Sequence, residues 1–103
     1  MSSTNDDLGG WALPTFKPAD GLATLQRELR NLGLTEREGR FERRGTAIAK
    51  AVVDGAVIQA ARVKRPRRGS PDWLPKTLKH SGDVRDFVAD LKKQLAAWSD
   101  ADD

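Results

Sequence analysis

An Asp-Gly pair at residues 54 and 55 stands between two runs of alanine, valine and isoleucine in TAIAKAVVDGAVIQAARV, residues 46–63. Asp-Gly between runs of this kind is a strong signal for a β-hairpin. The alternative is a helix, because alanine, which recurs along this stretch, is the best helix former. The Asp-Gly pair would break that helix in its middle, and valine and isoleucine favour a pleated strand. We therefore predict two strands here and keep the helix as the alternative.

Centring the turn on Asp54-Gly55 decides which side chains share a face of the hairpin, because side chains alternate along a strand. The predicted cross-strand pairs are Val53 with Ala56, Val52 with Val57, Lys50 with Gln59, and Ile48 with Ala61. One face is mostly alanine and comprises Ala47, Ala49, Ala51, Val53, Ala56, Ile58 and Ala60. The second face comprises Ile48, Lys50, Val52, Val57, Gln59 and Val63.

The small side chains of the alanine-rich face let helices approach closely, so we expect helices on that face. The second face is largely apolar and needs a cover. The candidates are an N-terminal arm that holds Trp11 and Phe16, or a second copy of the chain. A short strand at 40–43, turning at Arg44-Gly45, and a final strand within 76–80 would extend the sheet.

Leucines recur at helical spacing over residues 20–33, DGLATLQRELRNLG. The stripe consists of Leu22, Leu25, Leu29 and Leu32. Asp20 is the predicted N-cap, and Gly33 stands where a C′ glycine belongs. In the arm before this helix, Pro14 and Pro18 favour extended backbone.

The C-terminal segment carries a longer apolar stripe. It consists of Val84, Phe87, Val88, Leu91, Leu95 and Trp98. Ser81 is the predicted N-cap of this helix, and Asp83 lies in its first turn, where negative charge suits the helix dipole. Asp90 is expected to pair with Lys93, three residues further on.

These elements predict a two-layer α+β fold in the order α-β-β-(β)-α, an antiparallel meander packed against two amphipathic helices. We expect one domain over residues 11–99, a disordered tail at 1–10 and a frayed acidic tail at 100–103. The order is similar to that of double-stranded RNA-binding domains, which contact A-form RNA through a basic helix start and loops. The similarity covers the order of elements only. That family's helix opens with lysines, whereas Asp83 and Asp86 stand at this position here.

Composition and charge limit the classes of protein to consider. The chain has 103 residues and no cysteine, which excludes disulfides, thiol catalysis and thiolate zinc sites. No signal peptide is evident and no apolar run approaches the roughly 18 residues of a membrane span, so we expect a soluble, cytoplasmic protein. Arginine outnumbers lysine, and alanine and glycine are frequent, which fits a GC-rich bacterial genome. Residues 8–99 carry 18 basic and 10 acidic side chains, which favours an anionic partner.

No pattern in the sequence predicts catalysis, a metal or a cofactor. His80 is the only histidine and follows Lys79, whose charge disfavours a protonated imidazole. Glu36 and Glu38 have no apolar surroundings that would raise a carboxyl pKa. The nine glycines are scattered rather than gathered in a phosphate-binding loop. We therefore expect a protein that is not an enzyme.

Residues 62–80, RVKRPRRGSPDWLPKTLKH, gather seven lysines and arginines, three prolines and one tryptophan. The prolines hold the loop extended and its charges accessible, and the tryptophan offers a flat face for a base or a guanidinium. The candidate nucleic-acid-binding residues are Arg62, Lys64, Arg65, Arg67, Arg68, Trp73, Lys76 and Lys79. The alternative is a solvated connection with the tryptophan tucked against the core.

The leading hypothesis is a small protein that binds DNA or RNA without sequence preference through this loop, with an affinity that falls steeply as salt rises. The alternative is a protein-interaction module or homodimer formed over the second sheet face, with no nucleic-acid role. A third hypothesis is a regulator whose basic loop docks onto an acidic protein.

Overall fold

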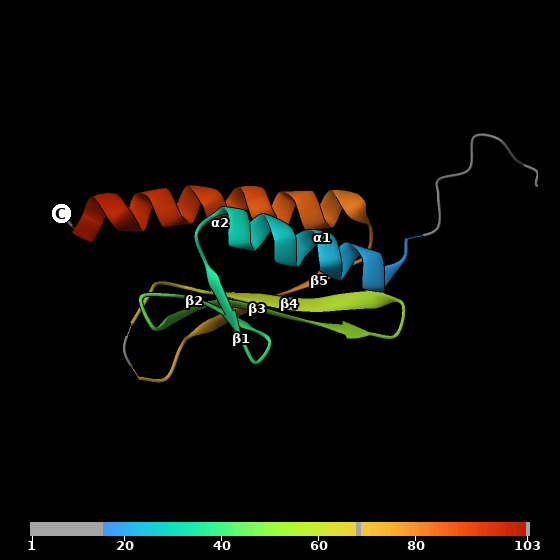
Figure 1. Ribbon diagram of the computed structural model, residues 1–103, viewed down its shortest axis with the longest axis horizontal. Helices are drawn as coiled ribbons and strands as arrows, with labels where there is room; N and C mark the ends of the chain where they lie inside the picture. Colours follow the sequence, from blue (N-terminus) through green and yellow to red (C-terminus); the bar gives the residue numbers. More distant parts are fainter. Residues whose placement is uncertain (1–15, 68, 103) are drawn as a thin grey trace, which may run out of the picture.

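The computed structural model describes residues 16–67 and 69–102, in which two helices lie over one face of a five-stranded antiparallel sheet (Figure 1). The helices are α1 (Pro18–Asn31) and α2 (Ser81–Asp102), and the strands are β1 (Thr35–Arg37), β2 (Arg40–Arg43), β3 (Thr46–Asp54), β4 (Val57–Val63) and β5 (Trp73–Leu78). The predicted two-layer α+β fold is confirmed. The predicted tail at 1–10 and the arm residue Trp11 lie outside the described residues.

The sheet is a plain meander, because each strand pairs with its neighbour in sequence, in the order β1-β2-β3-β4-β5. The strand predicted at 40–43 and its turn at Arg44-Gly45 are both present. Strand β1 was not predicted, and β5 begins at Trp73 rather than near residue 76. The turns before and after β2 are alike, since each joins a non-glycine residue at positive φ, Glu38 or Arg44, to a glycine at positive φ. Positive φ at both central residues is the requirement of a type I′ turn.

The β3–β4 hairpin forms as predicted, but its register differs by two residues. Asp54 pairs with Val57 and Lys50 pairs with Ala61, so the turn residues are Gly55 and Ala56 rather than Asp54 and Gly55. Gly55 has a φ of 61°, whereas Ala56 is not among the positive-φ residues. Glycine at the first central position alone is the pattern of a type II′ turn. The Asp-Gly pair marked a hairpin correctly and misplaced its centre.

The assignment of side chains to the two faces of the hairpin survives this slip, because a shift of two residues leaves the alternation unchanged. The alanine-rich face packs against the helices, where Ala49, Ile58 and Ala60 are buried. Leu78 joins them opposite Ile58. We call this face the helix side and the opposite one the outer face.

Helix α1 starts three residues earlier than predicted. Lys17 is the N-cap and makes no side-chain cap hydrogen bond, Pro18 is in the first turn, and Asp20 lies inside that turn. Proline suits a helix start because the missing N–H has no partner there in any case. At the other end, Gly33 has a φ of 90° and donates to the Arg30 carbonyl, while Leu34 donates to the Leu29 carbonyl. This is the Schellman arrangement, which confirms the predicted C′ glycine.

Helix α2 begins at Ser81, but the cap is His80. The backbone N–H of Asp83 donates to His80 Nδ1 at 3.3 Å, and Asp83 Oδ2 accepts from the backbone N–H of Lys79 at 2.8 Å. The predicted apolar stripe is confirmed. Val84, Phe87, Leu91 and Leu95 are buried, and Val88 and Trp98 pack against the core.

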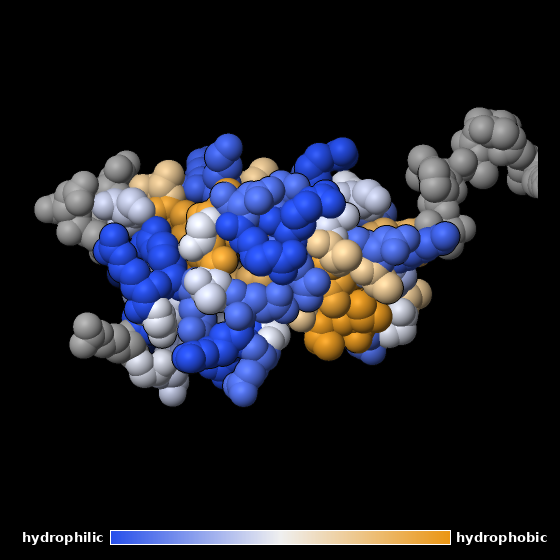
Figure 2. Space-filling model, in the orientation of Figure 1, coloured by the Kyte–Doolittle hydropathy of each residue, from blue (hydrophilic) through white to orange (hydrophobic). Residues whose placement is uncertain are grey.

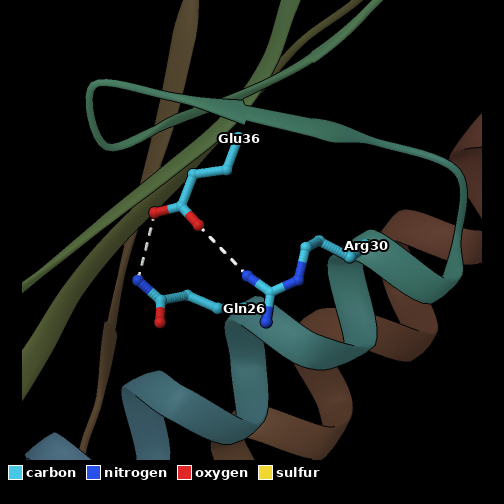
Figure 3. Close-up of polar contacts among 3 residues, drawn as sticks. All are labelled: Gln26, Arg30 and Glu36. Atoms are coloured by element: carbon cyan, nitrogen blue, oxygen red, sulfur yellow. Dashed lines mark hydrogen bonds and ion pairs between the residues drawn. The ribbon is translucent and has the colours of Figure 1, made fainter.

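A polar contact between α1 and the sheet positions the shortest strand. Glu36 of β1 accepts hydrogen bonds from Gln26 and Arg30 of α1, each at 3.2 Å (Figure 3). Glu36 is paired with Phe41, which is buried on the helix side. The contact therefore holds β1 beneath α1 although none of its three residues is buried.

The part of the N-terminal arm that is described packs on the helix side. A Cβ built on Gly21 would lie 2.8 Å from the ring of Phe16 and 3.2 Å from Ile58 Cδ1. Glycine at this position of α1 therefore allows the ring to pack closely against the helix and the sheet. The expectation that Phe16 of the arm covers the outer face is therefore wrong, because its ring lies on the helix side.

Candidate functional site

The structure divides the predicted basic residues between the two sides of the sheet. Arg62 lies on the helix side, where its Nε is 2.6 Å from Asp90 Oδ2 of α2. Asp90 was expected to pair with Lys93, and it pairs with Arg62 instead. Lys76 is also on the helix side, paired with Ala60, and Lys79 precedes the start of α2. These three cations do not share a surface with the rest of the loop.

The lysine and the aspartate near the start of α2 are part of its cap. The hydrogen bond from the Lys79 N–H is the largest cause that holds the pKa of the Asp83 carboxyl below its ordinary value, and burial acts in the opposite direction. Electrostatic contributions from the neighbouring Lys76 and His80 side chains add to the lowering. The folded start of α2 therefore stabilises the ionised form of the Asp83 carboxylate.

The remaining described loop residues lie between β4 and β5. Lys64 and Arg65 are exposed, and the Lys64 N–H donates to the Asp72 carbonyl at 2.9 Å. Arg67 forms an exposed ion pair with Asp72 at 3.1 Å. Arg68 lies outside the described residues. Figure 1 shows this loop, in yellow to orange, below the sheet and away from the helices.

Trp73 is half-buried on the outer face, where it pairs with Val63 across β4 and β5. The ammonium nitrogen of Lys50, from β3, lies 4.5 Å from the centroid of the ring. The two side chains therefore reach across the intervening strand β4, whose outer-face residue Ala61 is only 3% exposed. This pair supplies part of the cover that the outer face was expected to need.

A row of cations crosses the outer face. Arg37 of β1 is directly opposite Arg40 of β2, and Arg40 is directly opposite Lys50 of β3. Like charges in directly opposed positions repel one another and destabilise a sheet. Within the described part of the chain, no ion pair to an acidic side chain joins any of the three. No local pattern in the sequence indicates this row. Recognising Glu38-Gly39 as a turn would have placed Arg37 opposite Arg40.

A groove of about 400 Å³ lies where the 64–72 loop approaches the β2–β3 hairpin. Its lining residues are Arg40, Glu42, Arg44, Gly45, Thr46, Ala47, Arg67, Gly69 and Pro71. Glu42 lies two positions after Arg40 on β2 and so shares the outer face, and a register shift between Phe41 and Glu42 brings Ala47 opposite Glu42. The groove is therefore continuous with the cation row. The loop and the sheet together therefore form one basic surface, which we call the basic outer face: Arg37, Arg40, Arg44, Lys50 and Arg67.

The end of the sheet at the β3–β4 turn is hydrophobic rather than basic. Figure 2 shows hydrophobic side chains gathered over the end of the β3–β4 hairpin and hydrophilic ones over the β1–β2 region. Val52 is 60% exposed and Val53 is 37% exposed at this hairpin. Val52 lies on the outer face, paired with Gln59. The outer face thus changes from apolar to basic along the strands.

The described residues contain no group of three or more histidine, aspartate or glutamate side chains placed to hold a metal ion. Neither helix, over the part that is described, is long and apolar enough to cross a membrane. No protein-family model matches the chain, and neither a curated protein nor a solved structure gives a significant match.

Proposed function

We propose that this protein binds nucleic acid through its basic outer face, contacting phosphates without reading sequence. The observation that carries the proposal is the row Arg37, Arg40 and Lys50, which the sheet holds in direct opposition without acidic partners among the described residues. A polyanion laid across the row replaces this repulsion with attraction. The basic excess of residues 8–99, 18 basic against 10 acidic, supplies long-range attraction of the same sign.

The proposal differs from the loop-centred hypothesis in the residues that it uses. Arg67 and the exposed Lys64 and Arg65 remain in it, because their loop lies beside the cation row. Arg62 leaves it, because Asp90 already neutralises its charge. The bacterial origin and cytoplasmic location expected from composition stay predictions, as does the absence of enzyme activity.

Fluorescence anisotropy of a labelled duplex and of one of its single strands, titrated with protein at two salt concentrations, tests the proposal. The double variant Arg40→Gln/Lys50→Gln should lose about tenfold or more in affinity and lower the salt slope by about two, because each phosphate contact contributes about one unit. The matched control is Arg85→Gln/Lys92→Gln, which removes the same charge from exposed positions of α2. It should change affinity by about twofold at most. Absence of binding by the wild type at low salt would refute the proposal, and so would equal losses in the two variants.

A second candidate function is self-association, favoured by the exposure of Val52 at the hairpin end. Two copies meeting over their outer faces would bring their cation rows together, so contact would be confined to this end. Sedimentation of the wild type and of Val52→Asp tests it. A concentration-dependent dimer that Val52→Asp abolishes supports the candidate, and a monomeric wild type at high concentration rules it out.

A further inference from the structure

We propose that the groove between the 64–72 loop and the β2–β3 hairpin is a binding site for the phosphate group of a single nucleotide unit. The unit belongs to a strand end or an unpaired segment of nucleic acid, or to a free nucleotide. The assignment of the nucleotide unit to a nucleic acid rests on the proposed function. The assignment of a phosphate group as the ligand rests on the groove alone.

Three arginines line this groove, and they come from three separate parts of the chain. Arg40 comes from β2, Arg44 from the β2–β3 turn and Arg67 from the loop before β5. A guanidinium presents a planar fork of donors that matches two phosphate oxygens at once. Donors from three directions can surround one tetrahedral anion, whereas the open row across the strands offers contact from one side only.

The charge of the groove suits one phosphate group. Among the described residues, its lining carries three arginines and one glutamate, Glu42, which together hold a net charge of about two positive units. A phosphodiester carries one negative charge and a phosphomonoester between one and two, so either is neutralised there. Glu42 opposes additional negative charge, which disfavours a run of closely spaced phosphates inside the groove.

The ion pair that already exists beside the groove is weak enough to be exchanged. Arg67 and Asp72 are 3.1 Å apart, with side chains 54% and 64% exposed. Pairs this exposed contribute little to stability, so turning the guanidinium toward a phosphate costs little. Arg40 and Arg44 are exposed and need no such exchange.

The size of the groove excludes a duplex. A volume of about 400 Å³ is in the range of small-ligand sites. A nucleotide unit with its phosphate fits this space, whereas a double helix would lie across the mouth of the groove. The groove and the cation row therefore have distinct roles, one for a terminal or unpaired nucleotide and the other for a continuous backbone.

Two-dimensional NMR of the ¹⁵N-labelled chain, following backbone amides and arginine Nε–Hε groups, tests the inference. The probes are inorganic phosphate, adenosine monophosphate and adenosine, each titrated at constant ionic strength. Phosphate and adenosine monophosphate should shift the signals of Gly45, Gly69 and the groove arginines at saturable concentrations, and adenosine should not. The variants Arg44→Gln and Arg67→Gln should each weaken phosphate binding about tenfold, the loss of one charged hydrogen-bond pair. Arg37→Gln, on the same face but outside the groove, is the matched control and should leave it within about twofold.

Anisotropy with an oligonucleotide separates this inference from the proposed function. If the oligonucleotide binds but phosphate shifts nothing beyond the effect of sodium chloride, the groove inference is wrong and the proposed function stands. If phosphate binds in the groove but no oligonucleotide binds, the site takes free nucleotides and the proposed function is wrong. Equal losses of phosphate binding in Arg37→Gln and Arg44→Gln would overturn the groove as a discrete site.

Discussion

The contact between Lys50 and Trp73 determines whether the tryptophan ring can stack on a nucleic-acid base. The half-buried ring packs against the core, and the Lys50 ammonium covers a face of it at 4.5 Å. Little of the ring is then left for a nucleic-acid base. We infer that Trp73 positions Lys50 for phosphate contact and does not stack on bases.

Replacing Trp73 by leucine should therefore affect stability more than binding. Trp73→Leu keeps an apolar cover and should lower the free energy of unfolding by about 1–3 kcal/mol, measured by urea denaturation. Its affinity for a single-stranded oligonucleotide, measured below the unfolding transition, should fall about threefold at most. A stacking role would instead cost about 1–3 kcal/mol of binding, up to a hundredfold or more. Such a loss in a folded variant would contradict our inference.

Arg62 illustrates a basic residue that serves the fold. Its side chain is 18% exposed and donates both to Asp90 and, through Nη1, to the Val63 carbonyl. Arg62→Met and Asp90→Ala should each lower the free energy of unfolding by about 1 kcal/mol, and the double variant should lose less than the sum. Nucleic-acid affinity should change by about twofold at most in Arg62→Met. Additive losses of stability would show that Arg62 and Asp90 are not coupled. A larger loss of affinity in Arg62→Met would show that Arg62 contacts the nucleic acid.

Among the elements, the start of α2 has a titratable cap. Because the pKa of Asp83 is lowered in the folded chain, folding favours the ionised carboxylate. The stabilisation is complete above the pKa of the unfolded chain, about 4, and is lost as the pH falls through the lower folded value. The difference in unfolding free energy between the wild type and Asp83→Ala should thus be about 0.5–2 kcal/mol near pH 7 and should shrink below about pH 4. Asp86→Ala, an exposed change in the same turn, is the control. A difference that does not depend on pH would contradict the role of ionised Asp83.

The cation row predicts opposite effects on stability and binding. Arg40 lies between Arg37 and Lys50, so Arg40→Gln removes two repulsive contacts at once. At about 10 mM salt, where screening is weak, its free energy of unfolding should be equal to that of the wild type or higher by about 0.2–1 kcal/mol. Its nucleic-acid affinity should fall. Arg85→Gln, an exposed change on α2, serves as the control, and destabilisation by Arg40→Gln would mean that the row contributes to folding.

Over the whole molecule, the same repulsion makes stability depend on salt. Residues 8–99 carry 18 basic and 10 acidic side chains, so folding brings an excess of positive charges close together. The thermal midpoint should rise as sodium chloride increases from about 10 to about 150 mM, because the screening length falls from about 30 to about 8 Å. The rise should be smaller in Arg40→Gln/Lys50→Gln. A midpoint that does not respond to salt would show that the repulsion is already compensated.

How far the sequence could predict this structure varies with the kind of signal. Both apolar stripes and the two faces of the hairpin were predictable, because periodicity is preserved even when the register is off by two residues. The helix caps were less predictable, since the N-caps are His80 and Lys17 rather than the expected Ser81 and Asp20. Strand β1 has no apolar residue, so nothing in its own pattern indicates a strand. The basic outer face depends on which strands are neighbours, and a local basic run such as 62–80 therefore indicated only part of it.

The two open edges of the sheet carry a consequence for its behaviour in solution. On one side, β1 is three exposed residues long, two of them charged, and on the other β5 has Pro75 in its interior. Short charged strands and prolines make poor templates for a strand from another molecule. The chain can thus leave one whole face of a sheet uncovered by helices without inviting aggregation through its margins.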